Sequence, residues 1–124
     1  MQYIFLEYSI DCAHFLPNVE DGHKCGSMHG HRYDFRIEVA GTPDTYSGWI
    51  IDYAEVKKIA DPVIMSLDHR ELNAISGLEN PTCERIATWT RDQLLPLLPG
   101  LYSIEVRETA RAGAGWRRDG EVRQ

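Results

Sequence analysis

The chain has 124 residues, enough to enclose one ordinary hydrophobic core and too few for two, so a single domain spanning residues 1–124 is expected. Its hydrophobic fraction of 43% and charged fraction of 26% are typical of a globular domain. The formal net charge of −6 argues against general binding to nucleic acid or to anionic membranes. A small anion can still be held locally by four basic residues near the C-terminus: Arg107, Arg111, Arg117 and Arg118.

The first residues contain no basic segment and carry an early acid, Glu7, so no signal peptide is expected and the predicted location is cytoplasmic. No apolar run approaches the roughly 20 residues that a membrane-spanning helix needs. Three cysteines cannot all pair with one another, and a cytoplasmic chain keeps its thiols reduced. They are therefore expected to be thiols, metal ligands or catalysts, with Cys12 and Cys83 serving as small buried residues.

Two strands are predicted in the first third of the chain. Over residues 4–14 the even positions are apolar or small up to Cys12 and the odd positions include acids, which indicates a half-buried strand. Residues 15–28 contain Pro17 and two glycines and are predicted to form an ordered loop. Residues 29–39 alternate between ring or aliphatic side chains and charged ones, which predicts a second strand.

Two helices are predicted next. Asp52, followed three residues later by Glu55, resembles a capping box and indicates a helix start, and apolar residues at helical spacing follow as far as Leu67. Pro62 is expected to kink or divide this helix. A second helix is expected to start near Asn80-Pro81-Thr82 and to end before Pro99-Gly100.

The last quarter of the chain is predicted to add two strands. Residues 102–108 alternate again, Gly113-Ala114-Gly115 suggests a turn, and residues 116–122 are expected to form a final edge strand. The order strand, strand, helix, helix, strand, strand predicts an α+β fold, with two helices packed on one face of a four-stranded antiparallel sheet.

Three histidines suggest a metal site. His29 and His31, two residues apart on a strand, point to one face about 6.6 Å apart, and His14 ends the neighbouring strand. Three neutral nitrogen ligands with one open position are the arrangement of a catalytic zinc site. The alternative is that these strand histidines pack and form hydrogen bonds without a metal.

Other polar residues near the predicted strand ends suggest further chemistry. A thiol at Cys25, four residues before His29, becomes a better base or nucleophile beside a divalent cation, and the rival role is a fourth, structural zinc ligand. Asp68 can orient the adjacent His69 for proton transfer, unless the two form an ordinary surface turn. Glu108 continues the apolar face of its strand, so it either receives a ligand with N–H donors, such as an amino-pyrimidine edge, or lies in solvent beyond the sheet.

An ordered set of motifs covering nearly the whole chain resembles the 6-pyruvoyltetrahydropterin synthase family, and specifically its bacterial branch, which forms 6-carboxy-5,6,7,8-tetrahydropterin. The motifs are His14, Gly22-His23-Lys24-Cys25 through His29-Gly30-His31, Gly48-Trp49-Ile50-Ile51-Asp52, Leu67-Asp68-His69 with Leu72-Asn73, Glu79-Asn80-Pro81-Thr82 with Glu84, and Glu108-Thr109. One departure is Trp116, which stands where a tyrosine is expected.

The resemblance implies a role for each matching residue. His14, His29 and His31 would hold Zn2+, and Cys25 would be the catalytic base. Asp68 and His69 would complete a proton-transfer set contributed across a subunit boundary. Glu108 would anchor the pterin ring, with Thr82 and Glu84 near the pterin pocket. The fold implied is the tunnelling fold, in which several subunits close a barrel, usually as a homo-oligomeric hexamer formed by a dimer of trimers.

The reaction implied is a lyase reaction that converts 7,8-dihydroneopterin triphosphate to 6-carboxy-5,6,7,8-tetrahydropterin, acetaldehyde and triphosphate in 7-deazaguanine (queuosine) biosynthesis, a tRNA modification pathway. Only three residues separate Cys25 from His29, as in the carboxy-forming branch, whereas pyruvoyl-forming enzymes carry a longer insertion. Two alternatives stay open at this point: 6-pyruvoyltetrahydropterin synthase, which keeps the side chain, and a non-catalytic structural zinc protein.

Overall fold

The computed structural model describes residues 1–119. Two long strands begin the fold, β1 (Gln2–His14) and β2 (His29–Gly41). They pair antiparallel along their whole length, from Gln2 opposite Gly41 to His14 opposite His29. The alternation predicted from the sequence therefore forms a continuous two-stranded ribbon whose far end carries two of the three histidines.

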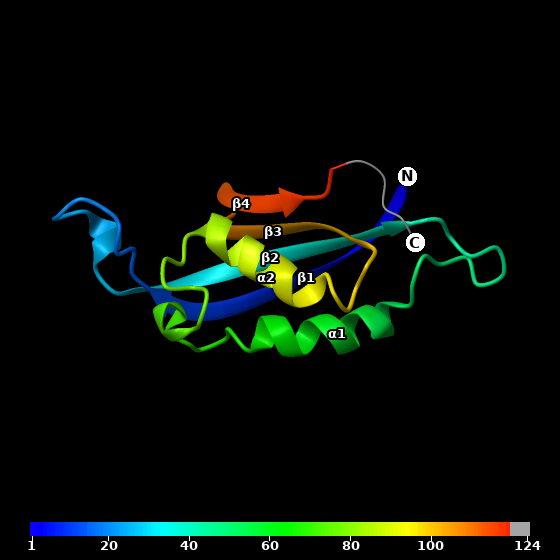
Figure 1. Ribbon diagram of the computed structural model, residues 1–124, viewed down its shortest axis with the longest axis horizontal. Coiled ribbons are helices and arrows are strands. Elements are labelled where there is room, and N and C mark those ends of the chain that lie inside the picture. Colours follow the sequence, from blue (N-terminus) through cyan, green and yellow to red (C-terminus); the bar gives the residue numbers. More distant parts are fainter. Residues whose placement is uncertain (120–124) are drawn as a thin grey trace.

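The sheet is completed by β3 (Leu101–Thr109) and β4 (Ala112–Arg117), both antiparallel to their neighbours. The strand order is β1-β2-β3-β4, with β1 and β4 at the edges. This is the predicted four-stranded antiparallel sheet (Figure 1).

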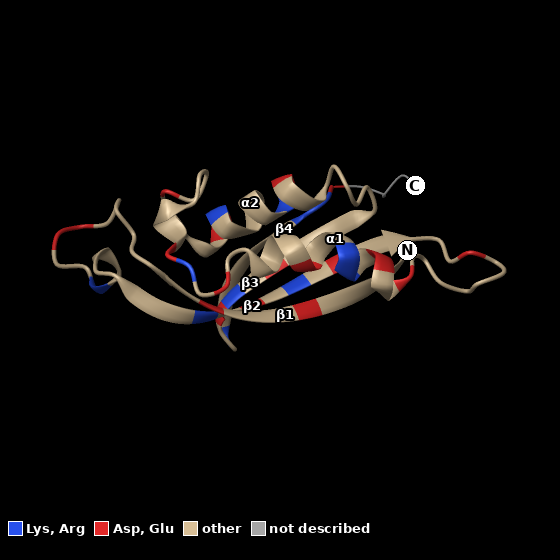
Figure 2. Ribbon diagram, turned by 90° about the horizontal axis from the view of Figure 1, so that it is seen from below, with Lys and Arg blue, Asp and Glu red and all other residues tan. Residues whose placement is uncertain are grey.

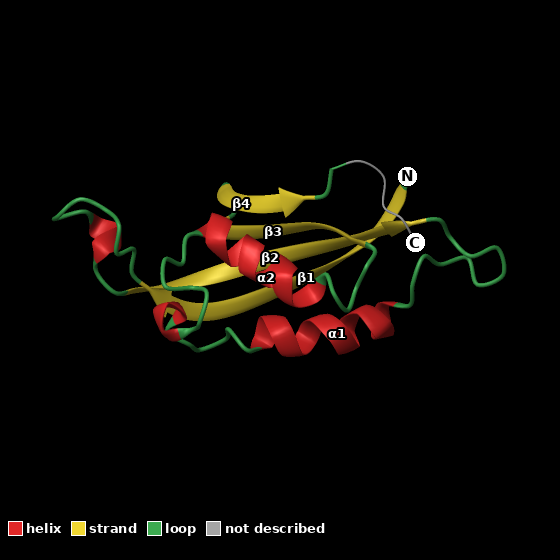
Figure 3. Cartoon of the chain, viewed as in Figure 1, coloured by secondary structure: helices red, strands yellow, loops and turns green. Residues whose placement is uncertain are grey.

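Two helices, α1 (Tyr53–Met65) and α2 (Cys83–Leu94), lie on the same face of the sheet, as predicted (Figure 2). Two short 3-10 turns, η1 (Lys24–Gly26) and η2 (Leu72–Ala74), interrupt the loops. The loop that carries η1 protrudes from one end of the sheet, and the loop from β2 to α1 protrudes from the other (Figure 3).

Side-chain caps explain where both helices begin. Asp52 accepts a hydrogen bond from the Ala54 N–H at 2.9 Å, and Thr82 accepts one from the Arg85 N–H at 3.2 Å. Each cap satisfies an amide that has no partner inside its helix. The two predicted helix starts are confirmed.

Pro62 does not divide α1, which continues as one element to Met65. The proline lies in the last turn, where its missing N–H removes a single helical hydrogen bond and its carbonyl still accepts from Ser66 at 3.2 Å. The helix α2 ends at Leu94 and does not extend to the residues before Pro99. Pro96, which lacks an N–H, explains this earlier end.

The predicted glycine turn at residues 113–115 is wrong. Gly113 and Gly115 lie inside β4, and the chain turns one step earlier, at Ala110 and Arg111. A Cβ at Gly113 would come within 2.3 Å of the Val106 carbonyl oxygen, so glycine here permits close approach to β3. The last strand therefore runs over residues 112–117, not 116–122, and residues 120–122 lie outside the described part of the chain.

The hydrophobic core fills the layer between the helices and the sheet. Its largest fully buried side chains come from both layers: Ile10, Tyr33, Phe35, Ile37, Ile64, Leu67, Leu72, Leu78, Ile86, Leu94, Leu98 and Leu101. The opposite sheet face carries charged side chains. Within residues 1–119, no helix is long and apolar enough to cross a membrane.

Candidate functional site

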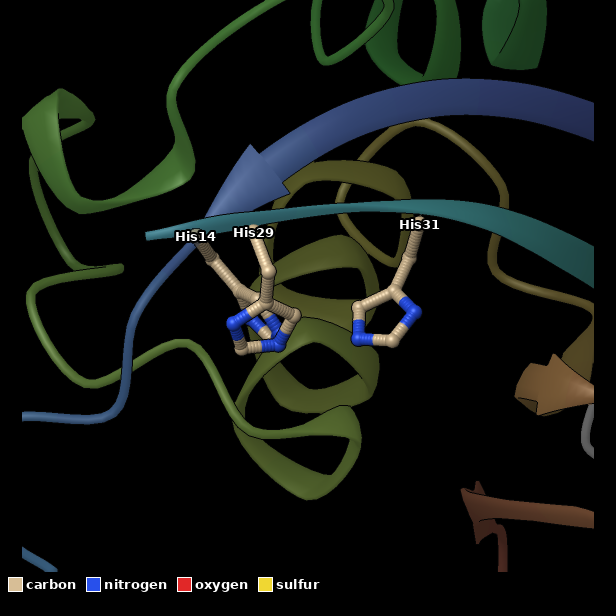
Figure 4. Close-up of side chains that lie close together, drawn as sticks. All are labelled: His14, His29 and His31. Atoms are coloured by element: carbon tan, nitrogen blue, oxygen red, sulfur yellow. The ribbon is translucent and has the colours of Figure 1, made fainter. Parts of the chain in front are cut away.

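His14, His29 and His31 converge at one end of the sheet, on the face that the helices cover. Register brings His14 opposite His29, and the two-residue period of β2 puts His31 on the same face. One ligand nitrogen from each ring lies within 4.8 Å of the others. Figure 4 shows the three side chains extending from the same side of β1 and β2. The predicted histidine cluster is therefore present within a single chain.

Two backbone carbonyls orient the rings of this cluster. The His14 Nδ1 lies 2.8 Å from the Pro81 carbonyl oxygen, and the His29 Nδ1 lies 2.6 Å from the Ser27 carbonyl oxygen. Because a carbonyl only accepts, each Nδ1 carries the proton and each Nε2 is unprotonated, with a lone pair that can bind a metal. Such outer hydrogen bonds are typical of metal-binding histidines.

The environment of His14 favours the neutral ring that a metal requires. The side chain is 1% exposed, and burial lowers its pKa. The hydrogen bond to Pro81 acts in the opposite direction, while the neighbouring His29 and His31 lower the pKa further. The imidazole therefore stays unprotonated to lower pH than an exposed histidine.

The donor set fits a divalent transition metal with open coordination positions. Within residues 1–119 the cluster comprises the three histidines alone, and Cys25 is not part of it. Three nitrogen donors without a fourth protein ligand match a catalytic site better than a closed structural one.

Cys25 lies in η1, within the loop that leaves β1 at His14 and enters β2 at His29. Its thiol is half-buried and unoxidised. Its carbonyl accepts from the Leu16 N–H at 2.7 Å, and its own N–H donates to the His23 Nδ1 at 3.0 Å. Both ends of this loop are thus anchored at the histidine cluster.

Glu108 lies half-buried near the end of β3, on the same face as the core residue Val106. Burial, followed by the negative charge of Glu108, raises the pKa of the Cys83 thiol to about 12. The same carboxylate acts on His14, where its negative charge partly opposes the lowering of the pKa that burial causes. Glu108 is therefore a neighbour of the histidine cluster and does not project into solvent beyond the sheet.

The other two predicted substrate-binding residues begin α2. Thr82 is half-buried and caps the helix, so its hydroxyl oxygen is engaged while its hydrogen can still be donated. Glu84 is exposed in the first turn. Pro81, immediately before them, carries the carbonyl that binds His14, so this segment borders the cluster.

Asp68 and His69 form the contact that the sequence left open. The His69 Nδ1 lies 3.0 Å from an Asp68 oxygen, and the other Asp68 oxygen accepts from the Asp11 N–H at 3.0 Å. The His69 N–H donates to the Asp11 carbonyl at 2.6 Å, and its backbone adopts a positive φ of 58°. The pair thus covers the outer edge of β1 at Asp11, near the end of the strand.

This pair does not join the histidine cluster of its own chain. Asp11 precedes His14 by three residues, a distance of about 10 Å along a strand. The His69 side chain is 79% exposed, and within residues 1–119 neither member of the pair forms a hydrogen bond or ion pair with the cluster.

Two supporting residues were given no role by the sequence reasoning. The Tyr33 hydroxyl lies 3.1 Å from both ring nitrogens of His14, and its position on the histidine face of β2 was a usable signal. The Asn73 side chain binds both backbone groups of Phe15, at 3.0 and 2.9 Å, and so fixes the residue after His14. Its place in the Leu72-Asn73 motif was the only local indication.

The basic residues near the C-terminus lie elsewhere. Arg107, Arg111 and Arg117 help to line a cavity of about 550 Å³ along β3 and β4. Arg107 contacts Glu105 and Arg118 donates to the Pro99 carbonyl. Charged strand residues line this cavity, and they alternate along the strands with the core residues. Because successive side chains on a strand point to opposite faces, the cavity opens on the sheet face opposite the histidines.

Comparisons with known proteins agree on one family. A family model described as 6-pyruvoyl tetrahydropterin synthase matches residues 3–119. The chain is 39% identical over 120 residues to a 6-carboxy-5,6,7,8-tetrahydropterin synthase of Synechocystis, covering 92% of each chain. It is 35% identical to a dihydroneopterin monophosphate aldolase of Pyrococcus furiosus, covering 78% of each chain. The Caenorhabditis elegans 6-pyruvoyl tetrahydropterin synthase structure matches with a TM-score of 0.82 at 25% identity, covering 96% of this chain and 98% of that one.

Proposed function

The chain belongs to the 6-pyruvoyl tetrahydropterin synthase family, and we propose that it converts 7,8-dihydroneopterin triphosphate and one water molecule to 6-carboxy-5,6,7,8-tetrahydropterin, acetaldehyde and triphosphate. This step leads toward 7-deazaguanines such as queuosine. The observation that carries the proposal is the histidine cluster, because it offers a metal three nitrogens from one chain and leaves Cys25 outside the ligand set. The Synechocystis relative and the three-residue spacing between Cys25 and His29 support the carboxy-forming reaction.

The metal proposed for His14, His29 and His31 is Zn2+, which suits a set of three imidazoles. When bound, zinc supplies Lewis-acid polarisation of the oxygens on the substrate side chain. The carbonyls of Pro81 and Ser27 hold two of the rings in the orientation that such binding needs.

Side chains of the protein bind the substrate and carry out the remaining proton transfers. The Cys25 thiolate removes a proton from a side-chain carbon of the substrate, and it is the half-exposed cysteine of the three. Glu108 accepts hydrogen bonds from the N–H groups of the pterin ring, and Thr82 and Glu84 border the ring. Asp68 orients His69, which exchanges protons with the substrate held by another subunit.

We further propose a homo-oligomer, formed as a hexamer from two trimers. Both edges of the sheet support it, because β1 and β4 each have one neighbour in the chain, and edge strands need pairing or cover. A cytoplasmic location is supported by the three free cysteines, which suit a reducing compartment.

The decisive experiment is product analysis with dihydroneopterin triphosphate as substrate. We expect acetaldehyde, followed with alcohol dehydrogenase and NADH, and 6-carboxytetrahydropterin in equal amounts by mass spectrometry. Triphosphate release without acetaldehyde, with three side-chain carbons kept on the pterin, would establish the pyruvoyl-forming reaction instead. Cleavage of dihydroneopterin monophosphate in a parallel incubation would favour an aldolase, the activity named for the Pyrococcus relative. Zinc-loaded protein that turns over none of these substrates would indicate a structural metal site.

A further inference from the structure

We propose that His23 is a positioning residue that fixes Cys25 within the loop between His14 and His29. The inference rests on the proposed function, in which Cys25 is the base. His23 acts through the backbone of Cys25 and needs no contact with the substrate.

Cys25 sits in a loop with little regular structure, so its position depends on a few hydrogen bonds. The loop spans residues 15–28, and its only regular element is the three-residue turn η1. Cys25 is the middle residue of that turn. A side chain on so short an element has no helix or strand ladder to fix it, and each local bond carries a large share of its order.

His23 contributes three of the bonds that shape this turn. Its Nδ1 accepts from the Cys25 N–H at 3.0 Å, and its carbonyl accepts from the Gly26 N–H at 2.9 Å. Its own N–H donates to the Glu20 carbonyl at 3.0 Å. Of these three, the bond from Cys25 is the one that depends on the side chain, so substitution of His23 removes it selectively.

The chemistry of the ring follows from its partner. A backbone N–H can only donate, so Nδ1 is unprotonated and the ring proton lies on Nε2. The imidazole thereby acts as an N-cap, a role that Ser, Thr, Asp and Asn usually fill. Asparagine is the informative replacement, because its Oδ1 and the histidine Nδ1 are both attached directly to Cγ.

The functional consequence follows from the position of Cys25. Its carbonyl is held by the Leu16 N–H at 2.7 Å, two residues beyond His14. With His23 in place, Cys25 is therefore held through both its N–H and its carbonyl. Loss of the N–H bond leaves the thiol free to shift, and about 1 Å of misplacement can lower a rate on the order of a hundredfold.

The test compares His23→Ala with His23→Asn. We expect the alanine variant to lose on the order of tenfold to a hundredfold in kcat, with little change in KM, because the thiol moves while the pterin contacts remain. The asparagine variant should recover most of this loss, since it restores the acceptor. Asp21→Ala is a matched control, because Asp21 is an exposed neighbour whose side chain forms no hydrogen bond within residues 1–119.

A second readout does not depend on the reaction. Cys12 and Cys83 are each 7% exposed, so alkylation of the native protein with iodoacetamide, mapped by peptide mass spectrometry, reports on Cys25. The His23→Ala thiol should react several-fold faster than wild type, and the His23→Asn thiol at the wild-type rate, with zinc content and melting temperature unchanged in both. Equal alkylation rates in all proteins, or failure of asparagine to restore the alanine defect, would overturn the role of His23. A wild-type protein inactive on every pterin would defeat the proposed function while the alkylation test still decides the role of His23.

Discussion

The histidine cluster and the Asp68–His69 pair lie near the same end of β1 but differ in how they are built. The cluster rings face inward, and carbonyls of Pro81 and Ser27 hold two of them. The pair is anchored to the free edge of β1 through Asp11, and the His69 ring projects into solvent. One chain therefore assembles the whole proposed metal site, whereas it only presents the pair proposed for proton transfer.

This difference agrees with the proposed division of the site between subunits. A site whose ligands come from two paired strands of one chain can exist before assembly. A rigid but exposed pair can serve chemistry only if another surface meets it, and the free sheet edges offer a way to bring subunits together. The comparison predicts that metal binding and proton transfer respond differently to mutation and to assembly.

The largest effect is expected from the double variant His29→Ala/His31→Ala. Removing two of three ligands should abolish stoichiometric zinc, and turnover should fall on the order of a thousandfold because Lewis-acid stabilisation is worth several kcal/mol. Elemental analysis and initial rates on one preparation measure both. Full zinc occupancy in this variant would show that the metal binds elsewhere. His69→Ala is the control and should keep its zinc.

His69→Ala should lower turnover on the order of a hundredfold, the contribution typical of a positioned acid or base. The sharper experiment mixes it with Cys25→Ala. If the two residues meet across a subunit boundary, randomly mixed oligomers should regain roughly a quarter of wild-type activity, because some interfaces then contain both native residues. Recovery is measured after co-expression and purification by two different tags. Mixtures no more active than their parents would place both residues within one subunit.

The smallest effect concerns acid stability and Asp68. The hydrogen bond from the Asp11 N–H, followed by that with His69, holds the Asp68 pKa below its usual range. Because the pKa of Asp68 is lower in the folded protein than in the unfolded chain, its ionised carboxylate stabilises the fold at pH values above the unfolded pKa of about 4. This stabilisation is lost as the pH falls through the pKa of the folded protein. Asp68→Asn should therefore melt earlier than wild type at neutral pH, because a neutral amide is a weaker acceptor.

That difference in melting temperature should shrink as the pH falls below about 4, the unfolded pKa, and should disappear below the lowered folded pKa, where the wild-type carboxylate is protonated. Thermal unfolding followed by circular dichroism at several pH values measures it. A difference that stays constant over this range would show that the charge of Asp68 does not contribute to stability.

Several features of the fold could be read from local patterns. The alternation along β1 and β2 and the caps at Asp52 and Thr82 predicted elements that the structure contains. Gly113 and Gly115 were predicted to form a turn, but glycine also occurs where two strands approach closely. Only the position of the Val106 carbonyl beside Gly113 shows that close approach is the reason here.

In the candidate site, too, some features could be predicted from the sequence and others could not. The spacing of His29 and His31 determines that they share a face, because side chains on a strand repeat every two residues. The hydrogen bond that the His23 Nδ1 accepts from the Cys25 N–H left no recognised signal, since histidine is not a usual helix cap.

The sequence by itself determined the first three strands, the helix starts and the shared face of His29 and His31, but it misplaced the last strand. Only the tertiary structure decided that His14 reaches His29, that the Pro81 carbonyl orients its ring, and that the His69 ring lies exposed beside Asp68. The physical reason is that local patterns fix geometry within one segment. Distances between segments depend on register, on packing against the core and on which backbone groups each loop can satisfy.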